Sequence, residues 1–172
     1  MKTKDMCLCA LFAVLIAVGA FIKLPISIVP ITMQTLFVML AGLFLKEKAV
    51  YSVLLYVGIG LLGFPVFTSG GGLSYVLVPT FGYLVGFIVC SYYLGHIKSD
   101  NFYKTLIHCL IGVLIIYIIG ILYFVFIQYV YYQQVFAFSW LLTSLFLVFL
   151  PGDILSCIVA IIIHRRLKAY VS

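Results

Sequence analysis

Long apolar stretches, separated by short polar or irregular breaks, fill the chain. We expect six of them to form membrane-spanning helices, at residues 6–22, 31–45, 49–63, 80–95, 106–128 and 140–163. A helix that crosses about 30 Å of hydrocarbon needs about 20 residues, so the second and third stretches are short. They must tilt little, thin the bilayer or extend into their loops. The pattern predicts an all-α membrane protein.

Composition and charge placement favour the same class of protein. Hydrophobic residues make up 66% of the 172 residues, charged residues make up 8%, and the mean hydropathy is +1.33. Soluble chains carry roughly half apolar and about a quarter charged residues. From Thr105 to His164, Asp153 is the only Asp, Glu, Lys or Arg. We therefore expect one membrane-embedded, substrate-binding domain, residues 1–172, with no room for a separate catalytic domain.

The basic residues predict the orientation. With both termini cytoplasmic, the cytoplasmic segments hold nine Lys and Arg residues and the outer segments hold Lys23 alone. This asymmetry is typical of membrane proteins and supports an even number of spans, here six. The start of the chain loosely resembles a signal peptide, but its apolar stretch runs on to Ile22, so we expect an uncleaved first helix. The nine cytoplasmic residues are Lys2, Lys4, Lys46, Lys48, Lys98, Lys104, Arg165, Arg166 and Lys168.

Several function classes are not favoured. The basic residues form no stripe with interleaved aromatics, so we expect no nucleic acid partner. The sequence has no GxxxxGK[ST] phosphate loop and no HExxH motif, which argues against a nucleotide-binding ATPase and a metalloprotease. The five cysteines have no metal-ligand spacing, and we interpret them as small apolar fillers. We predict no catalytic residues, no bound metal and no cofactor.

Glycine and proline gather on the predicted outer side, in the connections at 23–31 and 64–79 and at Pro151-Gly152. Irregular backbone at membrane depth survives only where protein buries it or where it lines a cavity. The glycine triplet at 70–72 is bounded by Phe64, Phe67, Leu73 and Tyr75. We therefore expect a folded lid over the outer mouth rather than a flexible turn.

Asp153 is the most informative single residue. It is the only acid inside a predicted span, about one turn below the outer end of the last helix. Intramembrane carboxylates face the bundle interior and are functional by default. The alternative is a helix cap, in which the carboxylate accepts from amide protons where Pro151-Gly152 restarts the helix. The two roles can coexist.

Other polar side chains begin helices on the same side. Gln34 begins the second span, and Thr80 and Tyr83 begin the fourth, three residues apart on one helical face. Phe67 and Tyr75 supply apolar walls. A mostly apolar cavity with a few polar groups suits a small organic molecule, whereas an ion needs more than one acid.

The first span carries small residues on one face. Ala13 and Ala17 are four residues apart, a spacing that lets another helix approach closely. That helix can belong to this bundle or to a partner protein, and the spacing alone favours neither.

Several motifs occur in order along nearly the whole chain: Val29-Pro30-Ile31-Thr32-Met33-Gln34-Thr35, then Gly63-Phe64-Pro65-Val66-Phe67 with the glycine triplet, then Pro79-Thr80-Phe81-Gly82-Tyr83-Leu84-Val85-Gly86-Phe87. Together with Pro151-Gly152-Asp153 they closely resemble the BioY family, the biotin-binding S components of energy-coupling-factor (ECF) transporters. The resemblance implies a six-helix protein of the bacterial cell membrane that captures biotin from outside. It also implies a transmembrane coupling protein and two cytosolic ATPases as partners, with Ala13 and Ala17 on the docking surface.

One position departs from the family pattern. The last-helix motif of the family is usually Pro-x-Asp-x-x-Lys, whereas this chain has Ser156 in place of the lysine. A hydroxyl forms hydrogen bonds but carries no charge, which puts the affinity for biotin in doubt. The only predicted outer cation, Lys23, could attract the carboxylate of biotin or anchor the first helix at the interface.

These observations lead to one function and three alternatives. We expect a biotin-binding S component of an ECF-type importer. An S component for another vitamin, a solitary biotin transporter or facilitator, and an intramembrane enzyme are the alternatives, and the missing catalytic motifs argue against the last. The residues expected to bind substrate are Gln34, Phe67, Gly71, Gly72, Tyr75, Thr80, Tyr83, Asp153 and Ser156.

Overall fold

All six apolar stretches are helical in the computed structural model, which describes residues 2–24, 31–99 and 101–171. The motif residues Val29 and Pro30 lie outside the described residues. The elements are α1 (Thr3–Phe21), β1 (Lys23–Leu24), β2 (Ile31–Thr32), α2 (Gln34–Leu45), η1 (Lys46–Lys48), α3 (Ala49–Leu61), η2 (Leu73–Leu77), α4 (Phe81–Gly95), α5 (Phe102–Val130), α6 (Phe138–Leu142), η3 (Thr143–Leu147) and α7 (Leu150–Val171).

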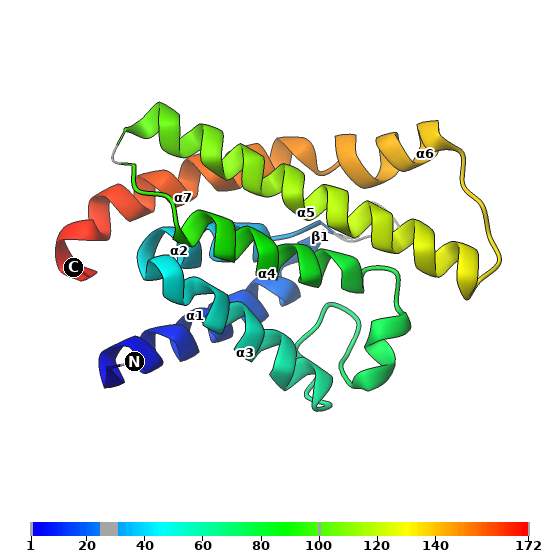
Figure 1. Cartoon of the computed structure of the whole chain (residues 1–172), viewed down its shortest axis with the longest axis horizontal. Helices are drawn as coiled ribbons and strands as arrows, with labels where there is room; N and C mark the ends of the chain where they lie inside the picture. The colour runs from blue at the N-terminus through cyan, green and yellow to red at the C-terminus, as the bar shows by residue number, and fades with distance from the viewer. Residues whose placement is uncertain (1, 25–30, 100, 172) are drawn as a thin grey trace.

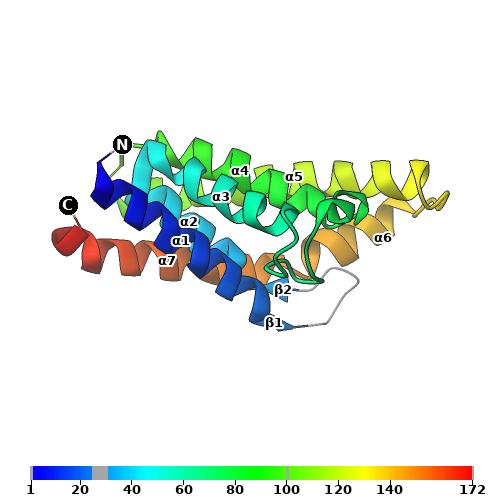
Figure 2. The same ribbon diagram turned by 90° about the horizontal axis from the view of Figure 1, so that it is seen from below.

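The helices run side by side along one long axis (Figure 1). α1 begins and α7 ends at the same end of the bundle, which we call the terminal end (Figures 1 and 2). Residues 64–79, which we call the lid, lie toward the opposite end, the lid end. β1 and β2 form a two-residue antiparallel ribbon, with Lys23 opposite Thr32, next to the end of α1.

Helix lengths agree with the sequence pattern. Among the described residues, three helical stretches are long and apolar enough to cross a membrane: Thr3–Phe21, Phe102–Val130 and Phe138–Lys168, which joins α6 to α7. Phe81–Gly95 is a shorter apolar helix. α2 has 12 residues and α3 has 13, so each spans about 20 Å at 1.5 Å per residue. The expectation that these two helices are short is confirmed.

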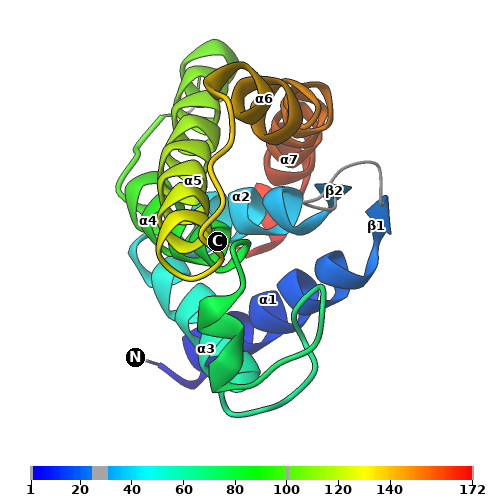
Figure 3. The same ribbon diagram turned by 90° about the vertical axis from the view of Figure 1, so that its right-hand side faces the viewer.

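α2 forms the centre of the bundle, where it packs against α1, α3, α4 and α7 (Figure 3). A helix with buried residues on most of its faces must approach its neighbours closely. A Cβ added to Gly42 of α2 would lie 2.7 Å from the Cβ of Leu94, and one added to Gly86 would lie 2.9 Å from the Cα of Ile116. Small residues therefore set the spacing of α2 from α4 and of α4 from α5.

The last span is irregular over a longer stretch than the sequence indicates. Pro151-Gly152 predicts a break near the start of the helix, and α7 does begin at Leu150. The five residues Thr143–Leu147 before it form a π-helical turn. Such turns widen a helix and are frequent at functional sites. The irregular backbone therefore begins at Thr143, about two helical turns before Pro151.

The glycine triplet forms an ordered turn, as expected. Phe67 and Gly70 exchange backbone hydrogen bonds of 2.9 and 3.3 Å, and the N–H of Gly72 donates to the carbonyl oxygen of Gly60 at 2.7 Å. Gly70 and Gly72 have φ of 119° and 104°, values that glycine adopts without steric cost. A Cβ on Gly71 would lie 2.1 Å from the Phe64 carbonyl oxygen. The three glycines thus fold the lid back onto the end of α3.

Candidate functional site

A cavity of about 50 Å³ lies beside the lid. Five separate parts of the chain supply its walls: α2 with its approach, the lid with Thr80, α4, α5, and the start of α7. Because the wall residues come from separate segments, the cavity exists only when these segments pack together in the folded bundle. The lining residues are Thr32, Gln34, Thr35, Thr68, Tyr75, Thr80, Tyr83, Leu84, Phe87, Ile116, Tyr117, Phe149 and Asp153.

Asp153 supplies the only charged side chain of this lining. It is 7% exposed, and its carboxylate accepts a hydrogen bond from the hydroxyl of Tyr117 on α5. The side chain of Thr35 on α2 also approaches this carboxylate. The backbone N–H of Asp153 donates to the Phe149 carbonyl oxygen at 3.0 Å, so the residue lies inside helical backbone. Its carboxylate therefore joins α2, α5 and α7 at the cavity wall.

A second buried chain of hydrogen bonds runs from the cavity to the lid. Gln34, 3% exposed, donates through Nε2 to the hydroxyl oxygen of Tyr56 at 2.8 Å. The Tyr56 hydroxyl donates in turn to the carbonyl oxygen of Val66 at 3.2 Å. The hydroxyl of Thr32 donates to Gln34 Oε1 at 3.3 Å. A group that binds Gln34 in the cavity is thus linked through Tyr56 to the backbone of the lid.

Hydroxyl groups also connect the lid to the start of α4. Tyr75 in the lid shares a hydrogen bond of 3.0 Å with Thr68 and one of 3.4 Å with Thr80. Lys23, beyond the end of α1, donates through Nζ to the carbonyl oxygen of Thr68 at 2.7 Å. The predicted outer cation therefore holds the lid backbone in this structure.

Tyr83 joins α4 to the irregular start of the last span. Its hydroxyl donates to the carbonyl oxygen of Leu145 at 3.4 Å, within the π-helical turn. The Tyr83 ring packs against Gly120 of α5, where an added Cβ would lie 2.8 Å from the ring atom Cδ1. The absence of a side chain at Gly120 thus makes room for the Tyr83 ring beside the cavity.

Comparisons with known proteins assign the chain to a family. A sequence model described as "BioY family" matches residues 1–172, the whole chain. The chain belongs to the BioY family. It is a membrane protein of a family of transporters, not an enzyme, and no cofactor is expected of this family.

Three similar proteins document the relationship. A probable biotin transporter BioY of Pyrococcus horikoshii is 37% identical over 170 residues, covering 98% of both chains. One from Lysinibacillus sphaericus is 46% identical over 127 residues, covering 71% of this chain and 65% of that protein, just under two thirds of its length. A crystal structure of the S component for biotin from an ECF-type ABC transporter is 28% identical, with a TM-score of 0.82 over 98% of this chain and 95% of that one.

Five of the residues predicted to bind substrate line the cavity: Gln34, Tyr75, Thr80, Tyr83 and Asp153. They are apart in sequence, and the structure brings them together. The remaining four lie outside the lining of this cavity. Their positions indicate other roles in shaping the site.

The four remaining residues support or flank the site. Phe67 is 1% exposed and lies behind the lining, with its ring centroid 5.4 Å from that of Tyr56 and 4.5 Å from that of Tyr75. Gly71 and Gly72 shape the lid backbone. Ser156, one turn after Asp153, is half-buried.

The sequence interpretation missed three polar residues at the site: Tyr117, Tyr56 and the cavity-lining Thr68. Tyr117 lies in the middle of the most apolar predicted span, and its hydroxyl contacts Asp153. Its place far from either end of the span was the available signal, because tyrosine in spans usually lies at the interface. Tyr56 offered the same signal, because it lies in the middle of the predicted span 49–63. Its partners Gln34 and Val66 lie in other segments of the chain.

The two alanines of the predicted docking surface differ in exposure. Ala13 is 3% exposed, since α1 packs against α2 and α3. Ala17 is half-buried. The exposed side of α1 carries Leu11, Val14 and Val18 instead, at 52%, 59% and 45%. Ala13 therefore contributes to packing within the bundle, and Ala17 lies at the edge of the free face.

Proposed function

We propose that this chain is the biotin-binding S component of an ECF-type importer. The observation that carries the proposal is the cavity itself: one carboxylate, Asp153, faces a mostly apolar space bordered by an ordered lid. Family membership supports biotin as the ligand, because the relatives are described as biotin transporters. Residues 1–172 act as a single membrane-embedded substrate-binding domain.

The chemistry of biotin matches the distribution of polar groups. Its ureido ring offers two N–H donors and a carbonyl acceptor, and its tail is an apolar chain ending in a carboxylate. In this proposal the Asp153 carboxylate accepts from a ureido N–H, and Gln34 or Thr80 donates to the ring edge. The rings of Tyr75 and Tyr83 pack against the apolar body, while Phe67, Gly71 and Gly72 hold the lid over it.

Ligand entry requires the walls to move. A cavity of about 50 Å³ is smaller than the roughly 300–1,000 Å³ of typical small-molecule pockets. The lid is joined to the bundle by few hydrogen bonds, notably those of Lys23, Tyr56 and Tyr75. In this proposal the lid lifts, biotin enters, and the same bonds close over it.

The six-span topology is part of the proposal. Both termini lie on the cytoplasmic side, which follows from the nine-to-one distribution of basic residues, and the lid faces outward. Cysteine substitutions at Gly70 and Lys98 test this topology. We expect an impermeant maleimide to label Gly70→Cys in intact cells and Lys98→Cys only after permeabilisation. Labelling of both from the same side would overturn the topology.

The proposed partners are a transmembrane coupling protein and two cytosolic ATPases, which supply the energy for uptake. Docking uses the free face of α1 that Ala17 borders. Ala17→Trp should abolish uptake and leave biotin binding nearly intact. Ala13→Trp should instead destabilise the purified chain, because Ala13 is buried. An equal loss of biotin binding in Ala17→Trp would assign this alanine to internal packing as well.

The decisive experiment is a calorimetric titration of the purified protein with biotin and with a panel of other vitamins. We expect saturable, one-to-one binding of biotin and none of the other vitamins. Selective binding of a different vitamin would establish a different S component. Uptake of biotin in cells that lack the ATPases would favour a solitary transporter.

A further inference from the structure

The terminal end carries a cleft that the proposed biotin site does not use. It has a volume of about 260 Å³ and lies where the start of α1, the end of α2, η1 and the end of α7 meet. We call it the lysine cleft. Its lining consists of Lys4, Asp5, Leu8, Leu43, Phe44, Leu45, Lys46, Lys48, His164 and Lys168.

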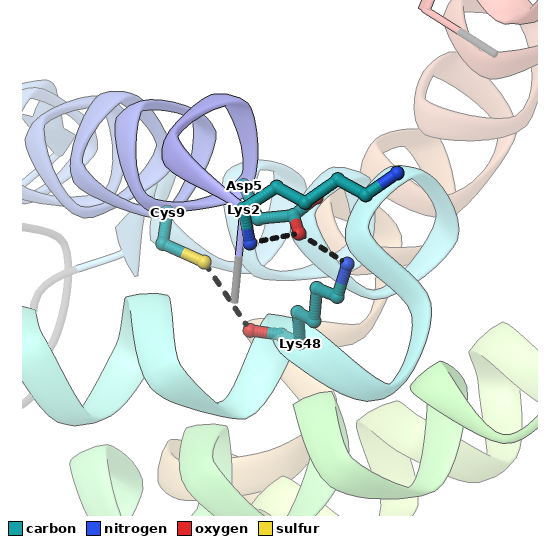
Figure 4. Close-up of polar contacts among 4 residues, drawn as sticks. All are labelled: Lys2, Asp5, Cys9 and Lys48. Atoms are coloured by element: carbon teal, nitrogen blue, oxygen red, sulfur yellow. Dashed lines mark hydrogen bonds and ion pairs between the residues drawn. The ribbon is translucent and has the colours of Figure 1, made fainter.

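The lining is strongly unbalanced in charge. It holds four lysines and a single acid, Asp5. That acid already pairs with Lys48, whose Nζ lies 2.6 Å from its carboxylate oxygen, and it accepts from the backbone N–H of Lys2 at 3.0 Å (Figure 4). The lining therefore has a formal charge of +3 with His164 neutral. An anion entering the cleft would meet a positive potential from three sides.

The backbone at Lys46, one of the cleft cations, is strained. Lys46 has a φ of 53° and a ψ of −133°, a conformation that favours glycine. The turn is held tightly, because a Cβ on Gly95 of α4 would lie 2.4 Å from the Lys46 carbonyl oxygen. Glycine would fit this backbone with less strain, so Lys46→Gly removes a cation of the cleft and suits the turn.

The floor of the cleft is apolar and opens toward apolar helix surfaces. Leu8, Leu43, Phe44 and Leu45 form this floor. Leu11, three residues after Leu8 on α1, is 52% exposed, and Leu167, three residues after His164 on α7, is 45% exposed, so each lies beside the cleft on its helix. A small inorganic anion would contact only the lysines of the cleft and would make no use of its apolar floor. A ligand with an anionic head and an apolar tail would use both features.

We propose that the lysine cleft binds the phosphate group of an anionic membrane phospholipid, with the acyl chains along α1 and α7. Basic pockets between helices on the cytoplasmic side bind such headgroups. The proposal rests on the proposed topology, which places the cleft at the inner leaflet. A bound lipid would brace the ends of α1, α2 and α7, the helices that meet at the terminal end.

A matched pair of double variants tests the site. Lys46→Gly with Lys168→Gln removes two cations of the cleft, and the glycine suits the backbone at position 46. Lys98→Gln with Lys104→Gln removes two exposed lysines of the same end that do not line the cleft. Each purified protein is titrated in detergent with phosphatidylglycerol, with phosphatidylcholine and with inorganic phosphate, and thermal unfolding and native mass spectrometry are recorded.

We expect phosphatidylglycerol, and not phosphatidylcholine or inorganic phosphate, to raise the unfolding temperature of the wild type. Because each lysine near an anionic surface contributes about fivefold in affinity, the cleft variant should bind phosphatidylglycerol roughly 25-fold more weakly. The control variant should match the wild type. Equal phosphatidylglycerol binding by the cleft variant would overturn the proposal, as would a full stabilisation by inorganic phosphate.

Two further readouts separate this proposal from the others. Biotin titration of every variant reports the proposed function independently, because the cleft and the biotin cavity share no lining residue. Co-purification with the coupling protein is measured for the same variants. If the cleft variant loses the coupling protein and keeps phosphatidylglycerol, the cleft binds an acidic segment of the partner and the lipid proposal is wrong.

Discussion

The lid end and the terminal end of this bundle treat polar groups in opposite ways. At the lid end, Gln34 and Asp153 are buried and bonded to side chains of other elements. At the terminal end, the cations Lys4, Lys46 and Lys168 stay exposed around open clefts. The backbone follows the same division, since the lid and the π-helical turn lie toward one end and a short turn, η1, joins α2 to α3 at the other.

The difference shows how a small apolar bundle can hold two kinds of site. An unpaired buried polar group costs about 1–3 kcal/mol, so burying Gln34 and Asp153 requires hydrogen-bond partners for both. At the lid end, several elements meet around one cavity and supply these partners to one another. The polar groups are thereby held in fixed positions, which allows the cavity to select one small ligand. In the proposed topology the exposed charges of the terminal end lie in the headgroup layer, where they can interact with large anionic surfaces.

Asp153→Asn should have the largest effect and should act only at the lid end. A hydrogen bond to a charged acceptor is worth about 1.5–3 kcal/mol, so biotin affinity should fall about tenfold to a hundredfold. Calorimetric titration measures this loss. Glu47→Gln, which removes an exposed acid of the terminal end, is the control and should bind normally. Unchanged affinity in Asp153→Asn would leave this residue with a structural role alone.

Gly71→Ala tests the fold of the lid. Its Cβ would lie 2.1 Å from a backbone oxygen, and overpacking of this kind costs about 1–3 kcal/mol. We expect weaker biotin binding and easier proteolysis of the lid. Gly58→Ala is the matched control, because nothing lies within 4 Å of the added Cβ and alanine stabilises a helix by about 0.5–1 kcal/mol. If both variants behave alike, the lid does not depend on this close contact.

Tyr117→Phe tests the partner of the carboxylate. Removing the donor leaves the buried Asp153 with less hydrogen bonding, so the free energy of unfolding should fall by about 1–3 kcal/mol. Thermal unfolding in detergent without biotin measures this change. Tyr92→Phe removes a hydroxyl from a side chain that is 57% exposed, and its stability should match the wild type. A stable Tyr117→Phe would show that Thr35 suffices to satisfy the carboxylate.

Ser52→Ala should give the smallest effect, and in the opposite direction. Ser52 is fully buried in the first turn of α3, and its Oγ has no hydrogen-bond partner among the described residues. Removing an unpaired hydroxyl should raise the free energy of unfolding by about 1 kcal/mol or less, with biotin affinity unchanged. A loss of stability would show that this hydroxyl is bonded after all and would weaken the contrast between the two ends.

The helices can be predicted from the sequence alone, because their signals are local. Apolar runs and the breaks between them located all six helical stretches, and the short lengths of α2 and α3 followed from counting residues. Motifs at matching intervals indicate the family without any knowledge of the geometry. Asp153 was found because a lone acid in an apolar span is conspicuous without reference to its neighbours.

The tertiary structure decided which polar groups meet. Tyr117 and Asp153 are 36 residues apart, and Gln34 and Tyr56 are 22 apart, so no local pattern joins them. Ala13 and Ala17 have the spacing of one helical face, yet they differ in burial. The rotation of α1 about its axis turns Ala13 inward and places Ala17 at the border of the free face. Such contacts depend on how α1, α2, α5 and α7 pack, since each partner must be desolvated and paired at once within the apolar interior.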